Sequence, residues 1–455
     1  MDFKKLVKWL EEHEWVFPVA IVVLATALRL PYLFQDSIWN DETVYMWLSD
    51  QVLGGKLGLF SKTVTNTSYP HLFVLVSTII NWFTDSFTAT RLASLAFALV
   101  NVWVVYLIGK KTTNKYGGVA ASLVLAFSAF HIFFSNRSLL DVPITAMFSV
   151  VLLAIVNFRP ESVKSALWLG GSLILCFFTK TNGIFAVPIA GLSALLLYPK
   201  PEYWKQKGSL ALMGALLLAV VIYLGNNYLN FGTFVVSGIG AVLESHIFTG
   251  STSFYLENGG LIYSWPVLLL AGVGMIMSFA EKTEMKAVSV GFLVNILFFS
   301  LIVGEKVPRY VLPTLPMAIL LAVYAGYRAV VKLKLPDYAV GGMVVLAIFT
   351  FSSFTPLIEP KSYTYTGFKE MGAQVEELEG YYHFNTIYSQ SIRQIRAFSG
   401  VEFYADGGKI KMLPSDLNEL LNQTGILIQL DIWEYTGPEW AYPLTQEKVD
   451  NLIAN

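Results

Sequence analysis

The sequence predicts a polytopic α-helical membrane protein with a small α/β domain at its C-terminus, and three observations support this fold class. Of the 455 residues, 55% are hydrophobic and only 14% are charged, whereas an ordinary soluble domain carries roughly 25% charged residues. Eleven segments are apolar over about the length that a membrane span requires, roughly 17–25 residues. The composition changes near residue 358, so we expect a membrane domain over residues 1–358 and a second domain over residues 359–455.

The eleven predicted spans follow one another along the membrane domain. They cover residues 15–34, 90–109, 116–134, 142–158, 165–179, 183–199, 208–224, 261–280, 286–303, 310–331 and 337–355. A further apolar stretch, 69–83, is short and contains Pro70, His71 and Asn81. If this stretch lies along the surface and the N-terminus is cytoplasmic, fifteen Lys and Arg residues fall on the cytoplasmic side and six on the outer side. Because cytoplasmic loops are enriched in Lys and Arg, we predict interfacial helices in the first outer loop, one of them over residues 69–83.

An odd number of spans places the two termini on opposite sides of the membrane. We therefore expect a multi-pass protein of the plasma membrane with a cytoplasmic N-terminus and an extracytoplasmic C-terminal domain. In that domain the pattern predicts helices over 367–379, 391–398 and 415–421 and strands over 385–388, 402–405 and 426–430. Such alternation favours a small α/β domain with a largely parallel sheet.

Charge and cysteine content exclude some classes of function. The net charge of −1 gives no electrostatic reason to expect a nucleic-acid partner. Cys176, the only cysteine, lies in an apolar run, so the sequence provides neither a disulfide framework nor a cysteine metal site. The expected partners are membrane lipid and a substrate bound at the membrane surface.

Polar residues gather at the outer ends of the predicted spans. Adjacent acids repel each other when they are desolvated, and Asp41 and Glu42 are adjacent at the lip of the membrane, among the aromatics Trp39, Tyr45 and Trp47. Other outer loops contribute Arg91, Arg137, Asp141, Lys180, His246, Lys306, Arg309 and Tyr310. A charge near the hydrocarbon costs on the order of 2.5–3.5 kcal/mol, so polar groups from several loops on one face indicate a site there.

Several of these residues also have structural explanations. Arg137 and Asp141 are four residues apart, a spacing at which an ion pair would cap a helix. Lys180 would reach the lipid headgroups by extending its side chain, and Arg91 would anchor to a lipid phosphate. The aromatics, including Trp39, fit an interfacial belt as well as a sugar-binding platform.

Carboxylates and cations at a lipid–water boundary favour transfer of a group from a lipid-linked phosphate. The leaving phosphate develops charge that Lys, Arg or Tyr would stabilise. The acceptor needs a positioned carboxylate as general base, which contributes roughly 10²–10⁴-fold. A transporter would instead concentrate its charges near the centres of discontinuous spans.

Four stretches resemble the GT-C glycosyltransferases, in particular the branch of protein O-mannosyltransferases and lipid A aminoarabinose transferases. They read LRLPYLFQDSIWNDETVY, RLASLAFALVNVWVVYLIGKK, SNRSLLDVPITAMF and KVPRYVLPTLP, in the family's order through about residue 330. The resemblance implies the GT-C fold and a polyprenyl-phosphate sugar as donor. It also implies that Asp41 is the general base, that Glu42 orients the acceptor or the loop, and that Asp141 is the second acid of the site.

The same resemblance assigns the donor phosphate. Arg309 and Tyr310 occupy the family's phosphate-binding position, with Lys306 nearby. Aminoarabinose transferases carry an Arg where this chain has Val44 and a Lys near residues 68–71, so we expect Lys180 to join Lys306 and Arg309 at the phosphate. The candidate contacts to the acceptor or the sugar are Arg91, Arg137, Trp39 and His246.

The predicted function is that of an inverting glycosyltransferase, a hexosyl- or pentosyltransferase that acts on the outer face of the membrane. The donor is a monosaccharide on polyprenyl or dolichyl phosphate, and the acceptor is a glycan, lipid or protein. We expect no required metal because the donor already carries a good leaving group, although an ion shared by Asp41 and Asp141 stays an alternative. An oligosaccharide transferase or ligase with a lipid-pyrophosphate donor, a non-catalytic transporter of lipid-linked sugars and a binding scaffold also stay open.

Overall fold

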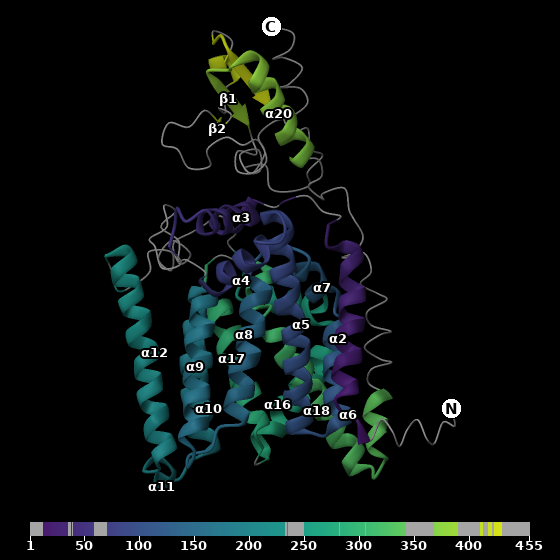
Figure 1. Ribbon diagram of the computed structural model, residues 1–455. Helices are drawn as coiled ribbons and strands as arrows, with labels where there is room; N and C mark the ends of the chain where they lie inside the picture. Colours follow the sequence, from purple (N-terminus) through teal and green to yellow (C-terminus); the bar gives the residue numbers. More distant parts are fainter. Residues whose placement is uncertain are drawn as a thin grey trace.

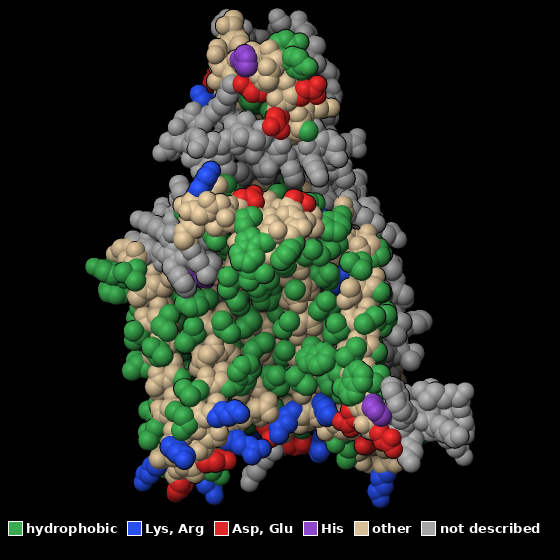
Figure 2. All heavy atoms as spheres, viewed as in Figure 1, with side chains coloured by type: hydrophobic (Ala, Val, Ile, Leu, Met, Phe, Trp, Pro, Cys, Tyr) green, Lys and Arg blue, Asp and Glu red, His purple; other side chains and the backbone are tan. Residues whose placement is uncertain are grey.

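The computed structural model shows a bundle of long helices with α3 (Asn40–Leu53) lying across one end and a small α/β unit beyond it (Figure 1). The structure describes residues 12–34, 38, 40–58, 71–232, 234, 250–281, 283–304, 306–342, 368–389, 410–412, 417–420 and 423–429. The sides of the bundle are largely hydrophobic, and Lys and Arg side chains gather at the end away from α3 (Figure 2).

The helices of the bundle correspond to the predicted spans. They are α2 (Val16–Arg29), α5 (Ser86–Thr112), α6 (Lys115–Phe127), α7 (Ala129–Ser135), α8 (Asp141–Val156), α9 (Val163–Thr179), α10 (Ala186–Leu197), α12 (Lys207–Phe231), α16 (Trp265–Ala280), α17 (Met285–Leu301) and α18 (Thr314–Lys332). Short helices adjoin them, namely η1 (Leu30–Tyr32), η2 (Thr181–Phe185), α11 (Pro201–Trp204), α14 (Phe254–Glu257), α15 (Gly259–Tyr263), η3 (Pro308–Val311) and η4 (Asp337–Gly341). Of the last predicted span, 337–355, only the part that forms η4 and the residue after it is described.

Not every apolar helix is long enough to cross a membrane alone. Three helical segments among the described residues are both long enough and apolar enough to cross a membrane, namely Ser86–Thr112, Lys207–Asn226 and Thr314–Lys332. Helices α6 and α7 taken together are also long and apolar enough to cross a membrane, although the chain bends by 61° between them. The other bundle helices are apolar but have 17 residues or fewer, so the number of eleven spans stays a prediction.

Local sequence explains where the central helices begin and how they pack. Asp85 caps α5 by accepting a hydrogen bond from the backbone N–H of Thr88, and Asn114 caps α6 in the same way through Gly117. Helices α5 and α6 approach closely because a Cβ on Gly109 would lie 2.9 Å from the Cα of Gly118. Many residues of α5, α8 and α18 are buried, so these helices form the centre of the bundle, whereas α12 lies at its edge (Figure 1).

The first outer loop forms two helices at one end of the bundle. The stretch predicted as an interfacial helix forms α4 (His71–Asn81), and α3 precedes it. They pack through Leu48 and Val74, and the ring of Tyr45 meets that of Phe73 edge to face at 5.5 Å. The acid pair lies in the first turn of α3, so this packing fixes where the acids stand.

The C-terminal part contains a three-stranded parallel sheet. Its strands β1 (Thr386–Ser389), β2 (Ile410–Met412) and β3 (Ile426–Gln429) are ordered β2-β1-β3, and helix α20 (Phe368–Tyr382) precedes them. The parallel pairing agrees with the expectation for this segment. The predicted helix 391–398 and strand 402–405 lie outside the described residues, and β2 was not predicted because three residues are too short for a periodic pattern.

Candidate active site

Four charged side chains from separate parts of the sequence meet at the α3 end of the bundle. Lys180 Nζ lies 2.9 Å from Asp141 Oδ1. Arg309 donates through Nη2 to Asp41 Oδ2 at 3.1 Å, and its Nε lies 4.0 Å from Asp141 Oδ2. Arg309 therefore bridges two carboxylates, and Asp141 faces two cations. We call these four residues the charge cluster.

Each member of the charge cluster lies at an end of a helix. Asp41 is in the first turn of α3, and Asp141 is the first residue of α8. Lys180 follows the last residue of α9, and Arg309 lies in η3, just before α18. The partial positive charge of a helix N-terminus stabilises a carboxylate, so both acids occupy electrostatically favourable positions.

The two acids differ in exposure. The side chain of Asp141 is 5% exposed, whereas that of Asp41 is 46% exposed. Burial lowers the pKa of Arg309, but the neighbouring Asp141 and Asp41 outweigh it, so the net pKa lies above the ordinary value for arginine. Asp141 thus anchors the two cations, and Asp41 is open to a molecule that enters from outside.

Two tyrosines adjoin the charge cluster. Lys180 Nζ lies 5.8 Å from the centre of the Tyr310 ring, within the range of a cation–π interaction. Burial, together with Asp41 and Asp141, raises the pKa of Tyr45 above its ordinary value, so its hydroxyl stays protonated. Sequence reasoning considered Tyr45 only as a belt or platform aromatic. Its position one helical turn after Asp41 is the signal that links it to the site.

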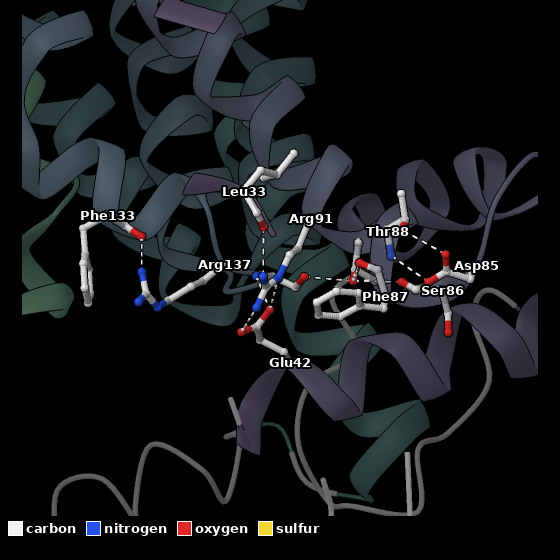
Figure 3. A network of polar contacts seen from close by, with 11 residues as sticks. Leu33, Glu42, Asp85, Ser86, Phe87, Thr88, Arg91, Phe133 and Arg137 are labelled. Carbon is white, nitrogen blue, oxygen red and sulfur yellow. Dashed lines mark hydrogen bonds and ion pairs between the residues drawn. The ribbon is translucent and has the colours of Figure 1, made fainter. Parts of the chain in front are cut away.

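Glu42 is adjacent to Asp41 in sequence but points into the protein (Figure 3). It is fully buried, and its two oxygens accept hydrogen bonds from Arg91 Nε at 3.1 Å and Nη2 at 3.3 Å. The backbone N–H of Ser138 also donates to Glu42 Oε2 at 2.9 Å. Of the two predicted roles, the geometry favours orienting the loop, because a buried carboxylate with these partners does not face an acceptor.

Arg91 is likewise part of the interior and not of the outer opening. It is fully buried, donates through Nη1 to the carbonyl of Leu33 at 2.8 Å, and lies 4.3 Å from the centre of the Phe87 ring (Figure 3). The burial of Arg91 and its protein partners do not suit the predicted contact to sugar, acceptor or lipid phosphate. The reason is that the guanidinium of Arg91 forms an ion pair with the buried carboxylate of Glu42.

Arg137 packs on its own helix turn. Its guanidinium lies 3.7 Å from the centre of the Phe133 ring and donates to the Phe133 carbonyl at 2.6 Å (Figure 3). It is 6% exposed, which does not suit the predicted contact to an acceptor or sugar. The described ion pairs of Asp141 run to Lys180 and Arg309, and not to Arg137 as the capping alternative required.

Lys306 does not join the charge cluster. Its Nζ donates to the carbonyls of Phe299, Ser300 and Val303 at 2.6, 2.8 and 2.5 Å, so its three N–H groups cap the end of α17. Burial lowers the pKa of Lys306. The expected contact to the donor phosphate is therefore not available to Lys306 in this arrangement. The remaining candidates, Trp39 and His246, lie outside the described residues.

The charge cluster offers a divalent metal ion two carboxylates, those of Asp41 and Asp141. Within the described part of the chain, no three His, Cys, Asp or Glu residues come together. Each carboxylate of the cluster already faces an ammonium or guanidinium group, whereas a hard cation needs several oxygen ligands.

Comparison with known families and structures agrees with this architecture. Residues 68–225 match the family described as dolichyl-phosphate-mannose-protein mannosyltransferase. ArnT from Cupriavidus metallidurans bound to undecaprenyl phosphate superposes with a TM-score of 0.65 at 16% identity, covering 88% of this chain and 86% of that chain. A search of curated proteins found no match.

Archaeal structures show the same fold at lower similarity. The Archaeoglobus fulgidus oligosaccharyltransferase tethered with an acceptor peptide gives a TM-score of 0.59 at 13% identity, covering 86% of this chain and 64% of that chain. AglB from the same organism, in complex with an inhibitory peptide and a dolichol-phosphate, gives 0.57 at 14% identity, with 86% and 64% covered. At these identities the likeness is one of fold, and it confirms the fold that the resemblance implied.

Proposed function

We propose that this chain, which has the fold of the GT-C glycosyltransferase superfamily, is an inverting glycosyltransferase that uses a monosaccharide on polyprenyl or dolichyl phosphate. The observation that carries the proposal is the charge cluster. It combines an exposed carboxylate, Asp41, with two cations that a buried carboxylate, Asp141, holds in place. A relative in fold, ArnT, has been seen with undecaprenyl phosphate, which supports a donor of this chemical class.

The two cations suit the phosphate of the donor. Lys180 and Arg309 approach Asp141 from two sides, so a phosphate at the opening would meet both charges. Arg309 Nε is buried and has no hydrogen-bond acceptor in the described structure, so a phosphate oxygen that reached it would satisfy this donor. Charge-assisted hydrogen bonds of this kind strengthen as the leaving phosphate gains negative charge.

Asp41 suits the role of general base. Its carboxylate accepts the proton of the acceptor hydroxyl while that oxygen forms a bond to the anomeric carbon of the sugar. The bond between this carbon and the phosphate oxygen breaks, and the lipid phosphate leaves with the electron pair. Attack from the face opposite the phosphate inverts the anomeric configuration. General-base catalysis of this kind contributes roughly 10²–10⁴-fold.

Arg309 connects the binding of the donor to the position of the Asp41 carboxylate, because both would bind the same guanidinium. Arg309 Nη2 donates a hydrogen bond to Asp41 Oδ2 at 3.1 Å, and this contact holds the carboxylate in place. A donor phosphate competes for the same guanidinium and weakens its hold on Asp41. The carboxylate is then free to bind the acceptor hydroxyl when the sugar is in place.

The arrangement of charge over the molecule supports an outward-facing site. Lys and Arg side chains gather at the end of the bundle opposite α3 (Figure 2), and such residues favour the cytoplasmic side. This distribution supports a topology in which the charge cluster and the C-terminal α/β unit lie outside the plasma membrane and the N-terminus lies in the cytoplasm. The acceptor is then a glycan, lipid or protein that is reached from outside the cell.

A lipid-pyrophosphate donor is the second candidate, because two archaeal oligosaccharyltransferase structures share the fold. The two cations of the charge cluster, Lys180 and Arg309, support the monophosphate donor, because they can neutralise the leaving phosphate without a metal ion. We therefore propose an enzyme that does not depend on a metal. Activity that a chelator abolishes, with pyrophosphate donors only, would favour the second candidate.

The deciding experiment is transfer of labelled sugar by purified protein in lipid. Polyprenyl-phosphate mannose, glucose and aminoarabinose are supplied separately, and both transferred and released label are counted. We expect turnover of one donor by the wild type and a loss of about 10²–10⁴-fold in Asp41→Asn.

A matched control lies on the same helix. Asp50→Asn replaces another acid of α3, one that is exposed and bonded to Asn81 at 2.9 Å, away from the charge cluster. This variant should transfer sugar at the wild-type rate. Turnover of no donor by the wild type, or equal rates in Asp41→Asn and Asp50→Asn, would refute the proposed function and leave the transporter or scaffold.

A further inference from the structure

A second polar network lies inside the bundle, below the charge cluster, and its centre is Arg29. Arg29 is fully buried at the end of α2. Its Nε donates to Ser135 Oγ at 3.0 Å, and its Nη1 donates to the carbonyls of Ala25 and Ala126 at 2.9 and 3.1 Å. Its Nη2 lies 2.8 Å from His131 Nδ1. Among the described residues, every partner of this cation is neutral.

These contacts join the two arms of a bent helix pair. Ala126 belongs to α6, whereas His131 and Ser135 belong to α7, and the chain bends by 61° between the two helices. A lysine cannot make the same set of bonds, because only a guanidinium offers several donors in a rigid planar fork. Arg29 therefore fixes the angle at which α7 leaves α6.

His131 extends the network to a third helix. Because an arginine N–H can only donate, His131 Nδ1 must accept, and the neutral ring then carries its proton on Nε2. Nε2 lies 3.1 Å from the side-chain amide of Asn101 on α5. Because a protonated Nε2 donates, we assign the amide oxygen to the side that faces the ring and the amide nitrogen to the side that faces Ser149. The Ser149 hydroxyl lies 2.7 Å from the other end of this amide.

The network ends at the backbone of Asp141. Ser149 donates to the carbonyl of Thr145 at 3.2 Å, and Thr145 donates to the carbonyl of Asp141 at 2.6 Å, each one turn up helix α8. At the other end, α7 leads directly into residues 136–140, whose Ser138 N–H binds Glu42. The segment from 136 to 141 is thus held at both of its ends.

We infer that Arg29 and His131 are positioning residues, which hold the turn between α7 and α8 so that Asp141 presents its carboxylate to Lys180 and Arg309. The inference rests on the proposed function for its effect on turnover, but not for its effect on the turn itself. A displacement of about 1 Å in a catalytic constellation costs as much as 10²-fold in rate. A loosened turn therefore lowers turnover although neither residue touches the substrate.

Two substitutions at His131 separate the network from simple packing. His131→Gln keeps an acceptor for Arg29 and a donor for Asn101, whereas His131→Leu keeps only the volume. We expect His131→Gln to retain kcat within about threefold and His131→Leu and Arg29→Lys to lose about 10- to 100-fold. The matched control is Ser278→Ala, which breaks a buried hydrogen bond of 2.6 Å to Ser289 between α16 and α17.

Hydrogen exchange at the Ser138 amide tests the turn without any assay of turnover. We expect exchange to rise by about tenfold or more in Arg29→Lys and His131→Leu and to stay at the wild-type rate in His131→Gln and Ser278→Ala. If the wild type transfers no sugar but these exchange rates hold, the proposed function fails and the positioning role stands.

A double-mutant cycle tests whether the effect passes through Asp141. If Arg29 acts by positioning this carboxylate, Arg29→Lys lowers kcat in the wild type but adds little in the Asp141→Asn background. Wild-type exchange at Ser138 in both Arg29→Lys and His131→Leu would overturn the inference. So would losses of kcat that add fully to that of Asp141→Asn.

Discussion

Glu42→Gln should destabilise the protein strongly, whereas Asp41→Asn should leave its stability nearly unchanged. Glu42 and Arg91 are both fully buried, with two hydrogen bonds of 3.1 and 3.3 Å between them. Removing one partner of a buried pair leaves the other charge unpaired and typically costs about 3–5 kcal/mol. Asp41 is 46% exposed, and an ion pair at such a position is worth at most about 1 kcal/mol.

The measurement is the free energy of unfolding in mixed micelles, made on both variants alongside the transfer assay. Glu42→Gln should lose stability by the larger amount, and its activity should follow the fraction that remains folded. Asp41→Asn should fold as the wild type does and lose turnover. The double variant Glu42→Leu/Arg91→Met supplies a control, since it leaves no unpaired buried charge; any loss of stability it shows reports the Ser138 N–H and the Leu33 carbonyl, which lose their partners. Equal losses of stability at the two acids would refute the reasoning, because the argument depends on their opposite environments.

Three further predictions concern the cations, the metal and pH. Lys180→Met should raise the donor KM by about 10- to 100-fold, the worth of a charged hydrogen bond, whereas Lys306→Met should leave KM unchanged and lower stability, because Lys306 caps α17. An excess of chelator should leave the transfer rate unchanged; a loss that added Mg²⁺ or Mn²⁺ restores would contradict the two-cation proposal. Burial and the carboxylates Asp41 and Asp141 raise the pKa of Tyr45 above its ordinary value of 10.0. Tyr45 should therefore stay protonated in the alkaline range of the assay, and the pH–rate profiles of the wild type and of Tyr45→Phe should have the same alkaline limb.

Hydropathy predicted most of the bundle because a membrane restricts what a helix can contain. The predicted spans up to residue 331 coincide with described helices, since long apolar runs have few other interpretations. The bend between α6 and α7 was not predicted, because apolar residues continue through Ser128 and hydropathy carries no information on direction. The strand β2 was missed for a different reason, namely that Ile410–Met412 is shorter than any useful period.

The charge cluster could be predicted in part because its members are costly at the membrane surface. Asp141, Lys180 and Arg309 stand at helix ends where a charge needs a partner, and the structure links them in a chain of ion pairs that reaches Asp41 through Arg309. Lys306 meets the same criterion but serves a helix end instead. Spacing in the sequence could not distinguish a cation that binds a carboxylate, such as Arg309, from one that binds backbone carbonyls, such as Lys306. The partner of each depends on the path of the chain between α17 and η3.

Arg29 and His131 were missed because they lie within runs that look apolar as a whole. A window average hides one arginine among many aliphatic residues, although a buried cation is a stronger signal than an exposed one. Their partners, Ser135, Asn101 and Ala126, lie about 70 to 110 positions along the chain from Arg29. Such contacts become visible only when the helices are assembled.

The adjacent acids have different roles because they lie on a helix. Successive residues of an α-helix point about 100° apart, so α3 can direct Asp41 towards the opening while it directs Glu42 into the protein. Glu42 then binds Ser138, and Asp41 binds Arg309, which also faces Asp141 at the end of the same turn. The two neighbours thereby connect α3 both to the α7–α8 turn, through Glu42, and to Arg309, through Asp41. A single acid at this position could do only one of these, which explains why two stand together at the lip of the membrane.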